Sequence, residues 1–228
     1  MTQQPKNNTT YFHLIVDKSG SMSGSVPVTL STINEQLETI RRLSETTPNQ
    51  KIFTGISLFD TVTEQLCLNT PTKDLKPVTE NEYVIGGMTA LLDAIGRTVI
   101  TLEEMVQQQV ANGEASVVVV VITDGYENAS RLFRFDQIKS MIQRLEATGL
   151  WTFTYFGADL NDISDAQRMG FANASSKSIR KEELPRYSKM MSDAIDSYVT
   201  DKEINYNVRK QFLDEDGDND TNTPRDKK

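Results

Sequence analysis

Side chains that carry oxygen donors stand at three places where a predicted strand ends or a predicted helix begins. Asp17, Ser19 and Ser21 alternate directly after an apolar run, so an extended backbone would turn all three to the same side. Thr89 follows two glycines at the start of a predicted helix, and Asp124 ends an apolar strand. Hydroxyls and carboxylates without thiolate or imidazole suit a hard cation such as Mg²⁺ better than zinc or copper.

Each of these segments has a simpler explanation when it is taken alone. The segment from Asp17 could be a helix cap followed by a Ser/Gly linker, and Asp124-Gly125 could be an ordinary turn. The loops at the carboxyl ends of parallel strands, however, line one crevice. The three segments either follow predicted strands or open a predicted helix. Their occurrence together therefore predicts one metal site.

Alternating strand and helix patterns must position these loops. Val117 to Ile122 is a run of β-branched residues, which is typical of a parallel strand buried on both faces. Only Asp60 and Thr61 separate two other strands, too few residues for a helical crossover, so this pair should be an antiparallel hairpin at an edge. The strands that can be assigned are 11–16, 52–59, 62–68, 117–122 and 150–156, and apolar stripes predict helices over 30–43, 91–106, 135–145 and 184–198.

These patterns predict an α/β fold, doubly wound and Rossmann-like, with helices on both faces of a mostly parallel six-stranded sheet that has one antiparallel edge strand. We expect a flexible N-terminus over 1–10, one domain over 11–205 and a polar, acidic, disordered tail over 206–228. An EF-hand in this tail is disfavoured, because Asn219 stands where glycine belongs and Arg225 where the bidentate glutamate belongs.

Composition limits the possible partners. The sequence has 24 basic and 32 acidic residues, a formal charge of −8 that disfavours nucleic acid and anionic membranes. Cys67 is the only cysteine, so an intrachain disulfide is impossible. The sequence shows neither an apolar signal core at its start nor a run of about 18 apolar residues. We therefore expect a cytoplasmic protein.

Three motifs resemble the metal-ion-dependent adhesion site of von Willebrand factor A domains: Asp-Lys-Ser-Gly-Ser-Met, Gly-Gly-Met-Thr-Ala-Leu and Ile-Thr-Asp-Gly, at 17–22, 86–91 and 122–125. The stretch Phe156-Gly157-Ala158-Asp159, together with Met169-Gly170-Phe171, also resembles stand-alone bacterial and phage members. The resemblance implies that Ser19, Ser21 and Thr89 contact the metal, whereas Asp17 and Asp124 hold it largely through waters. Mg²⁺ is the expected ion, with Mn²⁺ or Ca²⁺ possible.

The function that follows is protein binding rather than catalysis. Neutral hydroxyl ligands leave the cation electrophilic, so it can accept an exposed Asp or Glu of a partner protein. Met22, Met88 and Tyr126 are expected to form an apolar rim that contacts the partner, although loop packing would also explain them. Two other functions stay open: a phosphohydrolase with Asp17 as nucleophile, in which Ser19 replaces the second aspartate such enzymes need, and a scaffold whose metal only joins loops.

Three further residues lie near the predicted site. Asp93 follows Thr89 by four residues on one helix face, where it could support the site through a hydrogen bond or simply face solvent. Lys18 is interpreted as a solvated loop charge. His13, the only histidine, has a strand-packing role in this interpretation, because no nucleophile–base pair can be built around it.

Overall fold

The computed structural model describes residues 7–157, 160–171, 176–178 and 184–204. The predicted disordered tail, 206–228, lies outside these residues, as do residues 1–6 of the predicted flexible N-terminus. The first strand, β1 (Thr9–Asp17), begins two residues before the predicted start of the domain.

A single twisted sheet forms the centre of the molecule, with the strand order β3-β2-β1-β4-β5-β6. All neighbouring strands are parallel except β2 and β3, which pair antiparallel at one edge. The strands after β1 are β2 (Lys51–Phe59), β3 (Thr63–Pro71), β4 (Ala115–Thr123), β5 (Trp151–Gly157) and β6 (Ser176–Ser178). The predicted fold class is confirmed, including the antiparallel hairpin; five strands have seven to nine residues, and β6 has only three.

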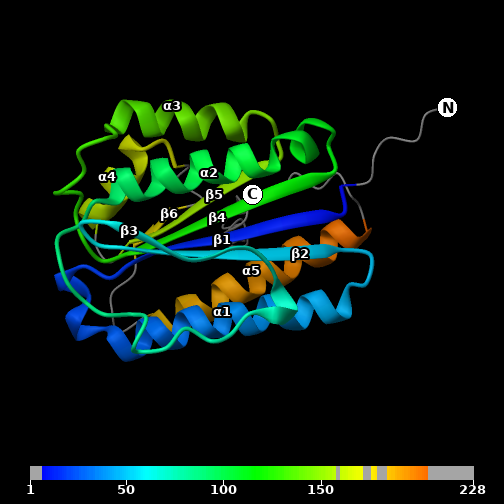
Figure 1. Ribbon diagram of the computed structural model, residues 1–228, viewed down its shortest axis with the longest axis horizontal. Helices are drawn as coiled ribbons and strands as arrows, with labels where there is room; N and C mark the ends of the chain where they lie inside the picture. The colour runs from blue at the N-terminus through cyan, green and yellow to red at the C-terminus, as the bar shows by residue number, and fades with distance from the viewer. Residues whose placement is uncertain (1–6, 158–159, 172–175, 179–183, 205–228) are drawn as a thin grey trace, which may run out of the picture.

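Helices cover both faces of this sheet, as Figure 1 shows. On one face lie α1 (Val26–Thr46) and α5 (Leu184–Ile204), and on the other α2 (Leu91–Ala111), α3 (Phe135–Glu146) and α4 (Leu160–Arg168). Short 3₁₀ turns, η1 (Gly20–Gly24) and η2 (Thr72–Asp74), follow β1 and β3. None of these five helices is long and apolar enough to cross a membrane, within the described part of the chain.

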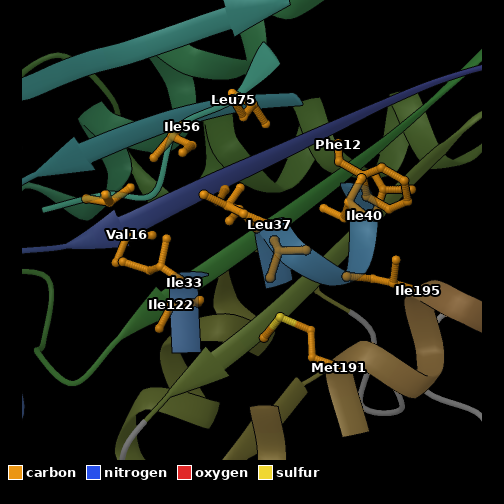
Figure 2. Packing of buried hydrophobic residues seen from close by; sticks show 14 of the residues in the cluster. Phe12, Val16, Ile33, Leu37, Ile40, Ile56, Leu75, Ile122, Met191 and Ile195 are labelled. Carbon is orange, nitrogen blue, oxygen red and sulfur yellow. The ribbon is translucent and has the colours of Figure 1, made fainter. Parts of the chain in front are cut away.

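The alternation of side chains along the strands divides the core into two layers. Phe12, Leu14 and Val16 face α1 and α5, where Ile33 and Ile195 pack against the sheet (Figure 2). Tyr11 and Ile15 point to the opposite layer beneath α2 and α3. Every residue of β4 is buried, as a central strand covered on both faces requires. Full burial of one large aliphatic side chain contributes about 1.5–3 kcal/mol, so these layers hold the strands firmly in register.

The side of the sheet on which the connecting helices lie changes beside β1. Helix α1 connects β1 to β2 on one face of the sheet, whereas α2 leads into β4 on the other face (Figure 1). The strands β1 and β4 are neighbours with parallel register, so their carboxyl ends meet at the point where the winding reverses. Such a point is where open α/β sheets bind ligands.

Candidate metal site

Asp17 ends β1 and lies at the bottom of the candidate site, fully buried. Its Oδ1 accepts a hydrogen bond from the Ser19 amide at 2.6 Å, and its Oδ2 accepts one from Thr123 Oγ1 at 2.6 Å. Burial raises the pKa of Asp17 to about 6, because desolvation penalises the charged carboxylate more than these hydrogen bonds favour it. A cation above this carboxylate would supply the missing opposite charge.

Hydroxyl groups from two of the loops meet above Asp17. Ser19 Oγ lies 3.0 Å from Ser21 Oγ and accepts a hydrogen bond from Thr89 Oγ1 at 3.1 Å. Ser21 Oγ in turn donates to Asp124 Oδ1 at 2.7 Å. The structure therefore brings all five predicted metal residues into one connected cluster of oxygen atoms, although they span more than a hundred positions of the sequence.

Gly125 borders this cluster and leaves it open. A Cβ atom at this position would lie 2.8 Å from Thr89 Oγ1, 3.1 Å from Ser21 Oγ and 3.2 Å from Asp17 Oδ2. Any side chain here would thus enter the space between the donors. An all-oxygen donor set around a space that only glycine leaves free fits a hard divalent cation. Ser19, Ser21 and Thr89 would offer the hydroxyls to it, and Asp17 and Asp124 the negative charge.

Two neighbouring residues, neither of which was predicted from the sequence, support Asp17. Thr123, the last residue of β4, uses its hydroxyl to hold the buried carboxylate of Asp17. Tyr83 is buried behind the site, and its hydroxyl donates to the main-chain oxygen of Asp17 at 2.5 Å. Burial and the nearby charge of Asp17 raise the pKa of this tyrosine, so it stays a neutral donor. The position of Thr123 before Asp124 could have suggested its role, but Tyr83 comes from a loop with no sequence signal.

The rim differs from the prediction at one position. Met88 and Tyr126 are 53% and 44% exposed, as a contact surface requires, but Met22 is only 2% exposed. The turn η1 directs Met22 into the core layer beneath α1, so its assignment to the rim is corrected. Val62 and Val84, which are 65% and 61% exposed, lie in neighbouring loops and were not predicted.

The hairpin turn that carries Val62 lies beside the second site loop. Thr61 Oγ1 accepts a hydrogen bond from the Met88 amide at 2.9 Å, and a Cβ atom on Gly87 would approach the same hydroxyl to 2.7 Å. Exposed apolar side chains thus flank the oxygen cluster on the hairpin side and on the side of Tyr126.

The three further residues have defined environments. Lys18 is mostly buried and pairs with Glu64 at 2.8 Å, so the expectation of a solvated charge is wrong. Asp93 makes hydrogen bonds, but to the backbone of 131–133 rather than to the oxygen cluster. His13 is buried with its Nε2 2.8 Å from Ser57 Oγ, and burial lowers its pKa to about 3, in keeping with a packing role.

Comparisons with known proteins identify the fold. No family model and no curated protein matches the chain. Among solved structures, the ArnB paralog VWA2 from Sulfolobus acidocaldarius has 18% identity and a TM-score of 0.54 over 79% of the chain. Proximal thread matrix protein 1 from the mussel byssus, with a zinc-occupied metal-ion-dependent adhesion site motif, has 12% identity and a TM-score of 0.55 over 84%. A von Willebrand factor type A structure from Catenulispora acidiphila has 13% identity and a TM-score of 0.50 over 82%.

The chain thus has the fold of von Willebrand factor A domains. It spans 44%, 47% and 42% of the length of these three structures, so it corresponds to less than half of each.

Proposed function

We propose that the chain is a protein-binding module that uses a divalent cation to capture an Asp or Glu side chain of a partner protein. The cation that we propose is Mg²⁺. The observation that carries this proposal is the oxygen cluster of Asp17, Ser19, Ser21, Thr89 and Asp124 around the space that Gly125 leaves open. The zinc-occupied motif of the mussel protein supports a divalent ion in this fold. Mn²⁺ or Ca²⁺ could replace Mg²⁺.

The chemistry of the cluster favours an acidic ligand. Three of its donors are neutral hydroxyls, which leave much of the positive charge of the cation uncompensated. Asp17 is buried with both oxygens engaged, so its carboxylate is poorly placed to attack a substrate. This geometry favours capture of a carboxylate over the alternative phosphohydrolase.

The surroundings of the cluster favour a protein over a small acid. Val62, Val84, Met88 and Tyr126 are large apolar side chains that remain exposed in the loops around the site. Exposed apolar groups gathered in one place are typical of protein interaction surfaces. We expect the partner to present its acidic side chain among apolar side chains that cover this rim.

An affinity capture tests the proposal. The immobilised chain is incubated with an extract of the cells that make it, in Mg²⁺ or in EDTA, and the retained proteins are identified by mass spectrometry. A partner should be retained in Mg²⁺ and released by EDTA. Ser21→Ala should lose it, because the variant removes a donor hydroxyl, whereas Ser23→Ala, a matched change at an exposed serine of the same turn, should retain it.

The same experiment separates the remaining alternative. If a partner is retained equally in Mg²⁺ and EDTA while the chain stays folded, the cation is not the bridge, and a scaffold with a structural metal becomes the better account.

A further inference from the structure

Asn128, a residue outside the oxygen cluster, holds the main chain of Thr89 on both sides. The Thr89 amide donates to Asn128 Oδ1 at 2.9 Å. The Thr89 carbonyl accepts from the amides of Asn128 and Ala129 at 3.0 and 3.2 Å. Thr89 precedes α2, which begins at Leu91, so these bonds rather than helix geometry fix its backbone. Fixing the backbone also fixes the direction in which the Thr89 side chain leaves it.

Glu127, the neighbour of Asn128, anchors the same loop to the start of α2. Its carboxylate accepts from the Leu92 amide at 2.9 Å and, within its own loop, from the amides of Ala129 and Ser130 at 3.0 and 2.8 Å. Ala90 occupies the N-cap position of α2, and its methyl group cannot accept a hydrogen bond. Glu127 therefore supplies from another loop the acceptor that a capping residue would give, which is favourable at a helix N-terminus.

Asp93 completes this connection from the helix side. Its carboxylate accepts from the amides of Arg131, Leu132 and Phe133 at 2.9, 2.9 and 3.0 Å. Helix and loop thus cap each other. The segment with Thr89 and the segment with Asp124 are consequently one connected unit, although 34 residues separate these two donors in the sequence.

We propose that Asn128 is a positioning residue that aims Thr89 Oγ1 into the metal site and so sets the affinity for the cation. This inference rests on the proposed metal-dependent function. Asn128 acts through Thr89: Thr89 Oγ1 is the atom that reaches Ser19 Oγ, and the Asn128 side chain bonds to the Thr89 amide.

The test is a double-mutant cycle read by calorimetric titration with Mg²⁺. Asn128→Ala removes one hydrogen bond, keeps the main-chain bonds and should weaken Mg²⁺ binding by about tenfold or more, as loss of a group that orients a metal ligand commonly does. In a Thr89→Ala background the same change should have no further effect, because the hydroxyl that it aims is gone. Equal losses in both backgrounds would overturn the inference.

Asn34 offers a matched control. Its side chain also holds a loop residue on both sides, since its Nδ2 donates to the Val78 carbonyl at 3.0 Å and its Oδ1 accepts from the Val78 amide at 2.8 Å. Asn34→Ala should lower the melting temperature at least as much as Asn128→Ala does, yet leave Mg²⁺ affinity unchanged. If Asn34→Ala weakens Mg²⁺ binding equally, the effect of Asn128 is general destabilisation and the inference fails.

A measurement in EDTA separates this inference from the proposed function. Amide hydrogen exchange should show faster exchange at Thr89 in Asn128→Ala than in the parent, and unchanged exchange there in Asn34→Ala. Unchanged exchange at Thr89 in Asn128→Ala would contradict the positioning role. If the parent binds no Mg²⁺, the proposed function fails, and the exchange result still decides whether Asn128 holds Thr89.

Discussion

Among single residues, the site depends on neutral hydroxyl groups that contact one another and on a buried carboxylate beneath them. The hydroxyls of Ser19, Ser21 and Thr89 meet one another, whereas Asp17 lies beneath them with both carboxylate oxygens engaged. A buried carboxylate is costly unless opposite charge or hydrogen bonds compensate it. A divalent ion would relieve this cost, so metal binding and stability should be coupled at this point of the fold.

Gly125→Ala tests whether the space between these oxygens is needed. The added methyl group would lie 2.8 Å from Thr89 Oγ1 and displace it, so we expect Mg²⁺ affinity to fall by about tenfold or more. Calorimetric titration measures the affinity, and circular dichroism checks that the fold persists. Gly24→Ala is the control, because a Cβ atom there would meet no atom of the described residues within 4 Å. Unchanged affinity in Gly125→Ala would mean that the cation binds elsewhere.

The donors of the cluster were predictable from sequence because each stands in a short motif of fixed spacing. Their supporting residues were not. Tyr83 reaches the main chain of Asp17 from 66 positions away, and Asn128 reaches Thr89 from 39 positions away. No local pattern encodes such contacts. Met22 was placed wrongly because its position in a polar loop suggested exposure, whereas the 3₁₀ turn directs it inward.

At the scale of elements, α5 is joined to the sheet by a buried lysine at the end of the strands opposite the site. Lys202 Nζ lies 2.8, 2.7 and 2.6 Å from Thr9 O, Thr10 Oγ1 and Ser116 Oγ, and it can donate to all three when it is protonated. Tyr198, one turn earlier, also donates to Ser116 Oγ. These contacts fix α5 across the beginnings of β1 and β4.

Lys202 should make stability depend on pH. Burial lowers its pKa to about 7 from the ordinary 10.5, so between these values the unfolded chain binds a proton that the folded chain has released. The free energy of unfolding should therefore rise with pH in this window, by up to about 1.4 kcal/mol per pH unit from this group, and the gain is absent below about pH 7. Tyr198, whose pKa burial raises above the ordinary 10.0, opposes this rise only near and above pH 10, where the unfolded chain begins to ionise this tyrosine.

The measurement is urea unfolding of the parent and of Lys202→Met at several pH values across this window. The variant should lack the part of the rise that Lys202 provides. Lys189→Met, a matched change at an exposed lysine of the same helix, should keep it. A rise of equal slope in Lys202→Met would show that Lys202 stays charged in the folded protein.

The sequence predicted some helices and strands correctly and missed others. Long apolar stripes predicted α1, α2, α3 and α5, because burial of one helix face imposes a repeat of three and four residues. Helix α4 was missed, because it has only nine residues and few of them are apolar, so its stripe is too short to stand out in the sequence. The 3₁₀ turns are too short to carry any period. The hairpin was predicted correctly, since a two-residue connection excludes a crossover.

At the scale of the whole molecule, one feature of the topology creates the site. The connections from β1 lie on opposite faces of the sheet. The loops after β1 and β4 and the loop before α2 therefore meet at the carboxyl ends of these central strands (Figure 1). Val62, Val84, Met88 and Tyr126, which lie in the loops at this end of the sheet, are exposed. Because the oxygen cluster and the exposed apolar side chains lie at the same end of the sheet, we expect one surface to bind both the proposed metal and the proposed partner.

The most direct measurement is a calorimetric titration of Mg²⁺ into chain freed of metal with EDTA, for the parent, Asp17→Ala and Thr89→Ala. One Mg²⁺ site is expected in the parent, with loss of binding in Asp17→Ala and severe weakening that is still measurable at higher Mg²⁺ concentration in Thr89→Ala. Thr89→Ala removes only a hydroxyl, so it keeps the test valid if Asp17→Ala folds poorly, and thermal unfolding in EDTA should stay cooperative. Equal Mg²⁺ binding in all three proteins, or tight zinc binding by a parent that does not bind Mg²⁺, would rule out a Mg²⁺ site at this oxygen cluster.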